Sequence, residues 1–151
     1  MIVVIGILAA ITIVAFNGIQ QRATTTTIRS DLASIHKKLE IYKVNSDAGE
    51  YPSNAAGLVS AELNATKSAY LTPTDRAQFY YCPSTDRQQY AVGVISKDNK
   101  GFYLVNGTIT ELSGAGTAIW GSTTCGEVGL SSGAYTGWNN TTSSWSNWIR
   151  G

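Results

Sequence analysis

Two cysteines are the residues of this chain whose chemistry is most distinctive. Cys82 and Cys125 are 43 positions apart and do not belong to a CxxC motif. We expect them to form a disulfide, which would close a long loop and contribute about 4 kcal/mol to stability by the chain-entropy argument. Such a bond would place the domain in an oxidising compartment outside the cytoplasm. Two separate buried thiols are the alternative.

The sequence offers little for catalysis or metal binding. His36 is the only histidine, and no Cys/His cluster accompanies it, so a histidine-based catalytic or zinc site is not expected. We expect His36 to be a solvated side chain on the charged part of a helix. P-loop, GxSxG and HExxH motifs are absent from the sequence. We therefore expect a protein that is not an enzyme, with no catalytic residue, no metal site and no cofactor.

The C-terminal part is rich in aromatic residues that lie among Ser, Thr, Asn and Gly. The possible surface-binding residues are Tyr135, Trp138, Trp145 and Trp148. Aromatic faces flanked by amides could stack on sugars or on bases. Base binding normally requires a basic groove, whereas the net charge is +1 and Arg150 is the only cation in this tail. No dedicated nucleic-acid binding is predicted. Surface glycans remain a possible partner, and the favoured alternative is that these rings fill the core or a subunit interface.

An apolar run opens the chain and must be placed before any of these residues can be positioned. Its large apolar members are Ile2, Val3, Val4, Ile5, Ile7, Leu8, Ile11, Ile13, Val14 and Phe16. A bilayer span needs about 20 such residues, so this run is short by several. It fits a buried core helix, a membrane anchor, or an anchor whose first residues are missing. We favour the third because Met1 leads directly into apolar sequence.

A periodic stripe follows the run. Ile28, Leu32, Ile35, Leu39 and Tyr42 are spaced by four, three, four and three positions, which is one face of an amphipathic helix. Proline is absent before Pro52. The pattern predicts one helix of roughly forty residues, apolar all round at first and amphipathic afterwards. Its second half needs a globular domain to cover the stripe.

The remaining chain predicts that domain. Three β-rich runs occupy 88–96, 101–105 and 108–112, and 79–82 is a possible fourth strand. Asn106-Gly107 between two runs is a strong hairpin signal, and a short helix is expected near 55–63. The predicted fold class is α+β: a long N-terminal helix packed on an antiparallel β-meander head. We divide the chain into residues 1–27, the apolar half of the helix, and residues 28–151, the head.

The segment from Val4 to Asn17 reads VIGILAAITIVAFN and resembles the N-terminal helix of type IV pilins. In that family an apolar run containing IGILAAI leads to a Pro-Asn-Tyr or similar segment. The match covers residues 1–22 and fixes the order of the residues as well as their apolarity. Val14 stands where many members have proline, so a proline-induced break is not expected. The family's cleavage site, its methylated residue and a nearby glutamate are expected to precede Met1.

The resemblance implies a structural subunit of a type IV pilus. Its apolar run would be the membrane anchor and then the core of a helical homopolymer, and its partners would be other copies and the pilus assembly machinery. The protein would reside in the bacterial inner or cytoplasmic membrane before assembly and in an extracellular pilus afterwards. Such filaments serve adhesion, twitching motility or DNA uptake. A pseudopilin of a type II secretion system and a membrane-anchored glycan-binding module are the alternatives.

Overall fold

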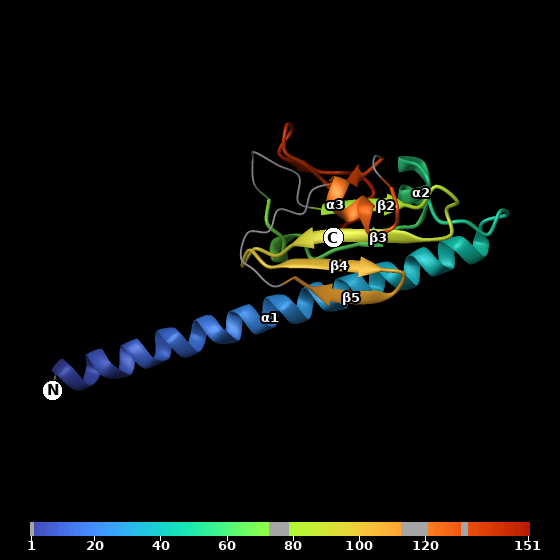
Figure 1. Ribbon diagram of the computed structural model, residues 1–151. Helices are drawn as coiled ribbons and strands as arrows, with labels where there is room; N and C mark the ends of the chain where they lie inside the picture. Colours follow the sequence, from blue (N-terminus) through green and yellow to red (C-terminus); the bar gives the residue numbers. More distant parts are fainter. Residues whose placement is uncertain (1, 73–78, 113–120, 131–132) are drawn as a thin grey trace.

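The computed structural model describes residues 2–72, 79–112, 121–130 and 133–151. A long helix carries a head on its C-terminal half, and its N-terminal half projects beyond the head (Figure 1). The helices are α1 (Ile2–Asn45), α2 (Ala55–Ser60), the 3₁₀ helix η1 (Lys67–Ala69) and α3 (Gly121–Gly126). The strands are β1 (Leu63–Asn64), β2 (Phe79–Pro83), β3 (Tyr90–Ile95), β4 (Gly101–Val105), β5 (Thr108–Glu111), β6 (Tyr135–Thr136), β7 (Trp138–Asn139), β8 (Ser144–Trp145) and β9 (Ile149–Arg150).

Helix α1 is continuous from the apolar run into the head, so the prediction of one long helix is confirmed. Its junction contains poor helix formers, since β-branched residues lose side-chain freedom in a helix. Thr24 and Thr26 donate their hydroxyl groups to the carbonyl oxygens one turn back, at 3.0 and 2.9 Å. These bonds satisfy the hydroxyl groups without breaking the helix. Past the end of α1, Gly49 adopts a positive φ of 64° and the chain reverses.

The sheet is antiparallel and has five strands in the order β5-β4-β3-β2-β6. The turn between β4 and β5 has positive φ at both central residues, 45° at Asn106 and 93° at Gly107, as the Asn-Gly pair predicts. The predicted meander is therefore confirmed for β2 to β5. Strand β6 was not predicted, and neither were the two-residue pairings of β1 with β9 and of β7 with β8.

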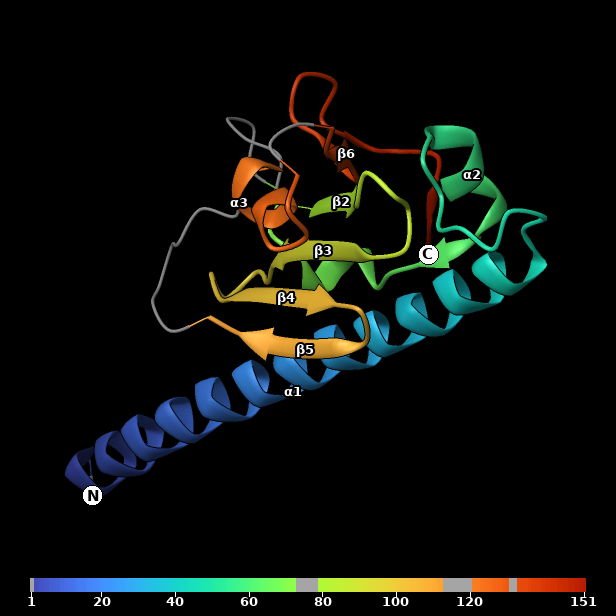
Figure 2. The same cartoon turned by 45° about the vertical axis from the view of Figure 1, so that its right-hand side comes forward.

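The core lies between α1 and one face of this sheet. Ile28, Leu32, Ile35 and Leu39 are fully buried, and Tyr42 is partly buried against the same cluster. The buried sheet residues of the cluster are Phe79, Tyr81, Tyr90, Val92, Val94, Phe102 and Leu104. Successive strand residues point to opposite faces, so Cys82 and Ala91 face away from α1 and cluster with Cys125 of α3. Figure 2 shows α3 against the sheet on that side. The α+β layout expected from the sequence is confirmed.

Candidate membrane and assembly surface

The apolar half of α1 presents bare apolar side chains in every direction. The exposed ones are Val3, Val4, Ile5, Ile7, Leu8, Ile11, Ile13, Phe16 and Ile19, each between 56% and 73% exposed. Ile2 and Val14 belong to the predicted set, but their side chains lie outside those the structure describes. Fully burying one such side chain is worth about 1.5–3 kcal/mol. A surface of this kind requires lipid or protein to cover it.

Helix α1 meets the length and composition required of a membrane span. Residues 2–19 rise about 27 Å at 1.5 Å per residue, close to the roughly 30 Å of a bilayer's hydrocarbon core. The first charged residue of the chain is Arg22. By length and composition, this helix could anchor the protein in a membrane with the head outside the hydrocarbon layer.

A hollow lies where the apolar half of α1 meets the head. Its volume is about 650 Å³, and it is formed by one side of α1 and the last residue of the turn between β3 and β4. The lining residues are Gly18, Gln21, Arg22, Thr25, Thr26, Arg29 and Lys100. We call it the basic hollow, since Arg22, Arg29 and Lys100 are its charged residues.

One carboxylate bridges two of these cations. Glu111 on β5 accepts from Arg29 at 3.2 Å and lies 3.3 Å from Lys100, each cation on a different oxygen. Partial burial raises the pKa of Glu111, but hydrogen bonds from Lys100 and Arg29 outweigh that effect and lower the pKa below its usual value. Three positive charges therefore line the hollow against one negative charge beside it. Its net charge is positive.

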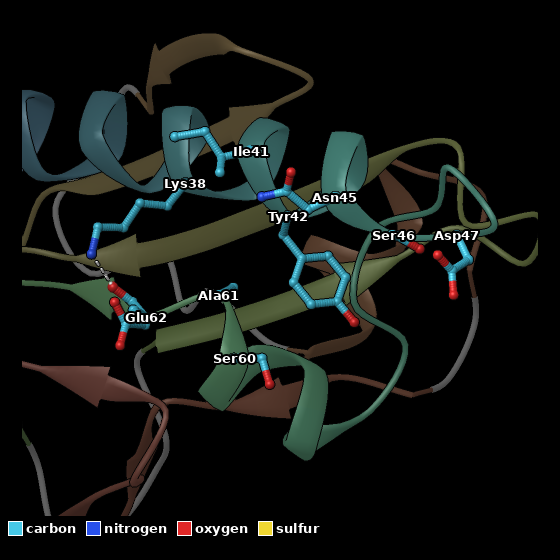
Figure 3. A pocket seen from close by; sticks show the side chains of 9 residues that line it. All are labelled: Lys38, Ile41, Tyr42, Asn45, Ser46, Asp47, Ser60, Ala61 and Glu62. Atoms are coloured by element: carbon cyan, nitrogen blue, oxygen red, sulfur yellow. Dashed lines mark hydrogen bonds between the residues drawn. The ribbon is translucent and has the colours of Figure 1, made fainter.

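A second hollow lies at the far end of α1, between this helix and α2 (Figure 3). Its volume is about 550 Å³. Lys38 donates across it to the carbonyl oxygen of Glu62, and Tyr42 forms part of its wall. Ile41, on the outer face of α1, is 59% exposed. This hollow has mixed charge, so it selects no ligand class by electrostatics.

The aromatic tail is mostly interior. Trp138 and Trp148 are 8% and 3% exposed, so the prediction that they are surface-binding residues is wrong for these two. Trp145 is half-buried and its ring centroid lies 5.6 Å from that of Trp138 and 6.0 Å from that of Phe79, edge to face. Half-buried Tyr135 donates its hydroxyl group to the carbonyl oxygen of Ser53. The burial of Trp138 and Trp148 favours the alternative we preferred, in which these rings fill the core.

The predicted disulfide between Cys82 and Cys125 is present. It joins β2 to α3 on the face of the sheet that points away from α1, and both cysteines are fully buried with Ala91 and Val128. The bond therefore fixes a second, smaller core on that face.

His36 is not the solvated side chain that we expected. Its Nδ1 lies 2.6 Å from the hydroxyl oxygen of Tyr90 and 3.6 Å from Oε1 of Glu40. The same Glu40 oxygen accepts from the hydroxyl group of Tyr51 at 2.6 Å. Burial and then the bond to Glu40 raise the pKa of Tyr51. Sequence analysis missed this network because the Asn-Gly turn, which covers His36, comes from a distant part of the chain.

No group of three or more His, Cys, Asp or Glu that could hold a metal ion is found within the described ranges. The sequence matches no protein-family model, and comparison with curated proteins and with solved structures gave no match either. The chain's own residues therefore carry the functional argument. These residues form a projecting apolar helix half, with the basic hollow where it meets the head.

Proposed function

We propose that this chain is a type IV pilin-like structural subunit that polymerises through the apolar half of α1. The observation that carries the proposal is the division of one helix between two environments. Ile28, Leu32, Ile35 and Leu39 are fully buried in the head, whereas every described large apolar side chain before Gln20 is exposed. The resemblance of residues 4–17 to the pilin N-terminal helix supports the same conclusion.

The mechanism follows from what the exposed half requires. Before assembly the helix resides in the membrane, where lipid covers its apolar side chains. The assembly machinery then extracts the subunit, and the apolar halves of many copies bundle together. Burial of apolar surface contributes about 25 cal/mol per Å², so a polymer can be held together without covalent links. Because each subunit presents one surface and accepts a different one, the contact is heterologous and generates a helix.

The heads would coat such a filament and face the environment. A disulfide is favoured in oxidising compartments, which agrees with a head that lies outside the cytoplasm. Adhesion, twitching motility and DNA uptake are the roles that the pilin resemblance brings with it. Of these we favour no single one, because the aromatic residues that suggested a sugar-binding surface are largely in the core.

Electron microscopy of surface-sheared material, labelled with an antibody against the head, tests the proposal. We expect long filaments decorated along their length. Decoration at the tips alone would identify a minor subunit. Label confined to the envelope, with short oligomers on chemical crosslinking, would favour the pseudopilin. Label on the envelope with monomers alone would contradict polymerisation and favour the anchored glycan-binding module.

A pair of variants separates assembly from membrane insertion. Ile13→Ala with Phe16→Ala keeps the helix apolar but removes contact surface, so we expect insertion to persist and filament number to fall about tenfold or more. Ile41→Ala with Val44→Ala removes exposed apolar surface from the head half of the same helix and serves as the matched control. Equal losses in both variants would contradict assignment of the polymer contact to the apolar half.

A further inference from the structure

The basic hollow lies at the depth where a membrane-inserted α1 leaves the hydrocarbon layer. Arg22 follows the last large apolar residue of the run, Ile19, by three positions, or about 4.5 Å along the helix axis. Arg29 lies about 10 Å further along the same axis. The polar interface of a bilayer leaflet is roughly 5–8 Å thick. The hollow therefore begins in the headgroup layer, at Arg22, and extends beyond its outer boundary, toward Arg29.

The β3–β4 turn brings the head's own charge to this level. Lys100, the last residue of this turn, lines the hollow together with Gly18, which belongs to the apolar half of α1. Figure 1 shows this end of β3 and β4 directed toward the projecting half of α1. Lys97 and Asp98 on the same turn offset each other in charge. The turn thus adds one net positive charge to the two arginines of the helix.

The cations of the hollow exceed the anions that the head supplies to them. Arg29 and Lys100 share the single carboxylate of Glu111. Arg22 has no ion-pair partner in the part of the chain that the structure describes, and it is exposed. Arg22 and Arg29 are seven positions apart and therefore lie on the same face of α1. Their side chains can reach one anion or two adjacent anions.

We propose that the basic hollow binds the phosphate groups of anionic phospholipids while α1 is inserted in the membrane. Guanidinium groups bind phosphate through paired N–H donors, and lysine adds a point charge. Each basic residue near an anionic membrane surface strengthens attachment. The inserted subunit would then be held twice, by its apolar helix and by headgroups at the base of the head. This inference rests on the membrane-inserted state in the proposed function and does not depend on polymerisation.

The experiment uses the full chain reconstituted into vesicles that contain equal amounts of phosphatidylglycerol and phosphatidylcholine. After gentle detergent extraction, native mass spectrometry measures the ratio of the two lipids that stay bound. Flotation of the vesicles after alkaline washing reports insertion independently. For the wild-type chain we expect insertion and a roughly tenfold excess of bound phosphatidylglycerol.

Two double variants remove the same charge from different places. Arg22→Gln with Lys100→Gln removes two cations of the basic hollow and should abolish the lipid preference while leaving insertion unchanged. Lys37→Gln with Arg87→Gln is the control and should keep the preference. In each pair one residue is an exposed helix cation and the other is ion-paired in the head, with Glu111 for Lys100 and with Glu50 for Arg87.

The outcomes separate the two proposals. The lipid site would be overturned if the wild-type chain inserted but showed no lipid preference. It would also be overturned if the preference remained in the Arg22→Gln, Lys100→Gln variant. Either outcome would leave the pilin proposal standing. Equal loss in the control variant would show that overall charge, not the hollow, attracts the lipid, and would also overturn the lipid site. Failure of the wild-type chain to insert would overturn both proposals.

Discussion

Glu111 joins the sheet to the helix at the base of the head. Its carboxylate binds Arg29 of α1 and Lys100 of the β3–β4 turn, so three parts of the fold meet at one side chain. Arg29 also lies over the ring of Phe102, with its guanidinium carbon 5.9 Å from the ring centroid. Because the Glu111 side chain is about one-third exposed, at 32%, solvent screens these ion pairs and their contribution is modest.

Glu111→Gln should lower the free energy of unfolding at pH 7 by about 0.5–1 kcal/mol. The folded-state pKa is below the unfolded value, so the contribution of the carboxylate is complete above the ordinary value of 4.5 and is lost as pH falls through the folded pKa. Urea unfolding in detergent at pH 7 and at pH 3 measures the difference. Asp47→Asn is the control. If wild type and Glu111→Gln differed in free energy of unfolding by the same amount at pH 7 and pH 3, the stabilising role of the ionised Glu111 would be contradicted.

The disulfide acts mainly on the unfolded chain. Cys82→Ala with Cys125→Ala should lower the free energy of unfolding by about 4 kcal/mol, because a long loop is released. Thermal unfolding with and without a reducing agent checks this. The reductant should reproduce the loss in the wild-type chain and have no effect on the variant. If complete reduction left the thermal unfolding of the wild-type chain unchanged, the disulfide would not stabilise the head.

The hairpin between β4 and β5 is positioned by a close approach to α1. A Cβ atom added at Gly107 would lie 2.9 Å from Nε2 of His36, and the backbone there has a φ of 93°. Gly49 also has a positive φ, 64°, but a Cβ atom there would meet open space. The two glycines therefore separate backbone strain from crowding.

Gly107→Ala should cost more stability than Gly49→Ala. Both place alanine in the left-handed region, at about 1–2 kcal/mol, and the first adds about 1–3 kcal/mol of overpacking. Chemical denaturation of both variants gives the comparison. Adding His36→Ala to Gly107→Ala should recover part of the extra loss. Equal losses of unfolding free energy in the two glycine variants would mean that the His36 side chain moves aside at no energetic cost.

The elements with strong local patterns were predictable from sequence, whereas those fixed by distant contacts were not. The spacing from Ile28 to Tyr42 and the Asn-Gly turn determine α1 and the β4–β5 hairpin. Strand β6 is two residues long and exists because Tyr135 and Thr136 pair with β2, which no local pattern indicates. Burial of Trp138 and Trp148 has the same cause, since a tryptophan among small polar residues has the same local sequence inside or outside a core.

The basic hollow could not be predicted from the sequence either. Arg22 and Arg29 are visible as helix residues of one face, but Lys100 joins them only after the sheet has folded against α1. Glu111, which shares two of the cations, comes from another strand. Charges drawn from separate elements show no spacing in the sequence, so the hollow appears only at the level of the fold.

The molecule as a whole divides cleanly between the apolar half of α1 and the head. The described buried residues begin at Thr24, so none of the described side chains before Thr24 belongs to the core of the head. Removal of residues 1–22 should give a detergent-free, monomeric head whose unfolding free energy lies within about 1 kcal/mol of the full chain.

Size-exclusion chromatography and near-ultraviolet circular dichroism check the truncated head. A chain that is helical but lacks a near-ultraviolet signal would show that the helix needs its first half in order to dock on the sheet. Aggregation that persists after Ile41→Ala and Val44→Ala are added would show the same, since those are the exposed large apolar residues left on the helix.

Because α1 is continuous, a tilt of its apolar half in a membrane would move the head as well. This helix is a rod about 66 Å long at 1.5 Å per residue, and no proline or break separates its apolar half from the head. Transmembrane helices tilt by about 20° on average. Pivoting by that angle about the middle of the span would carry the far end of the rod sideways by roughly 18 Å. The head would tilt with the helix, so that one of its sides approaches the membrane surface and the opposite side moves away from it.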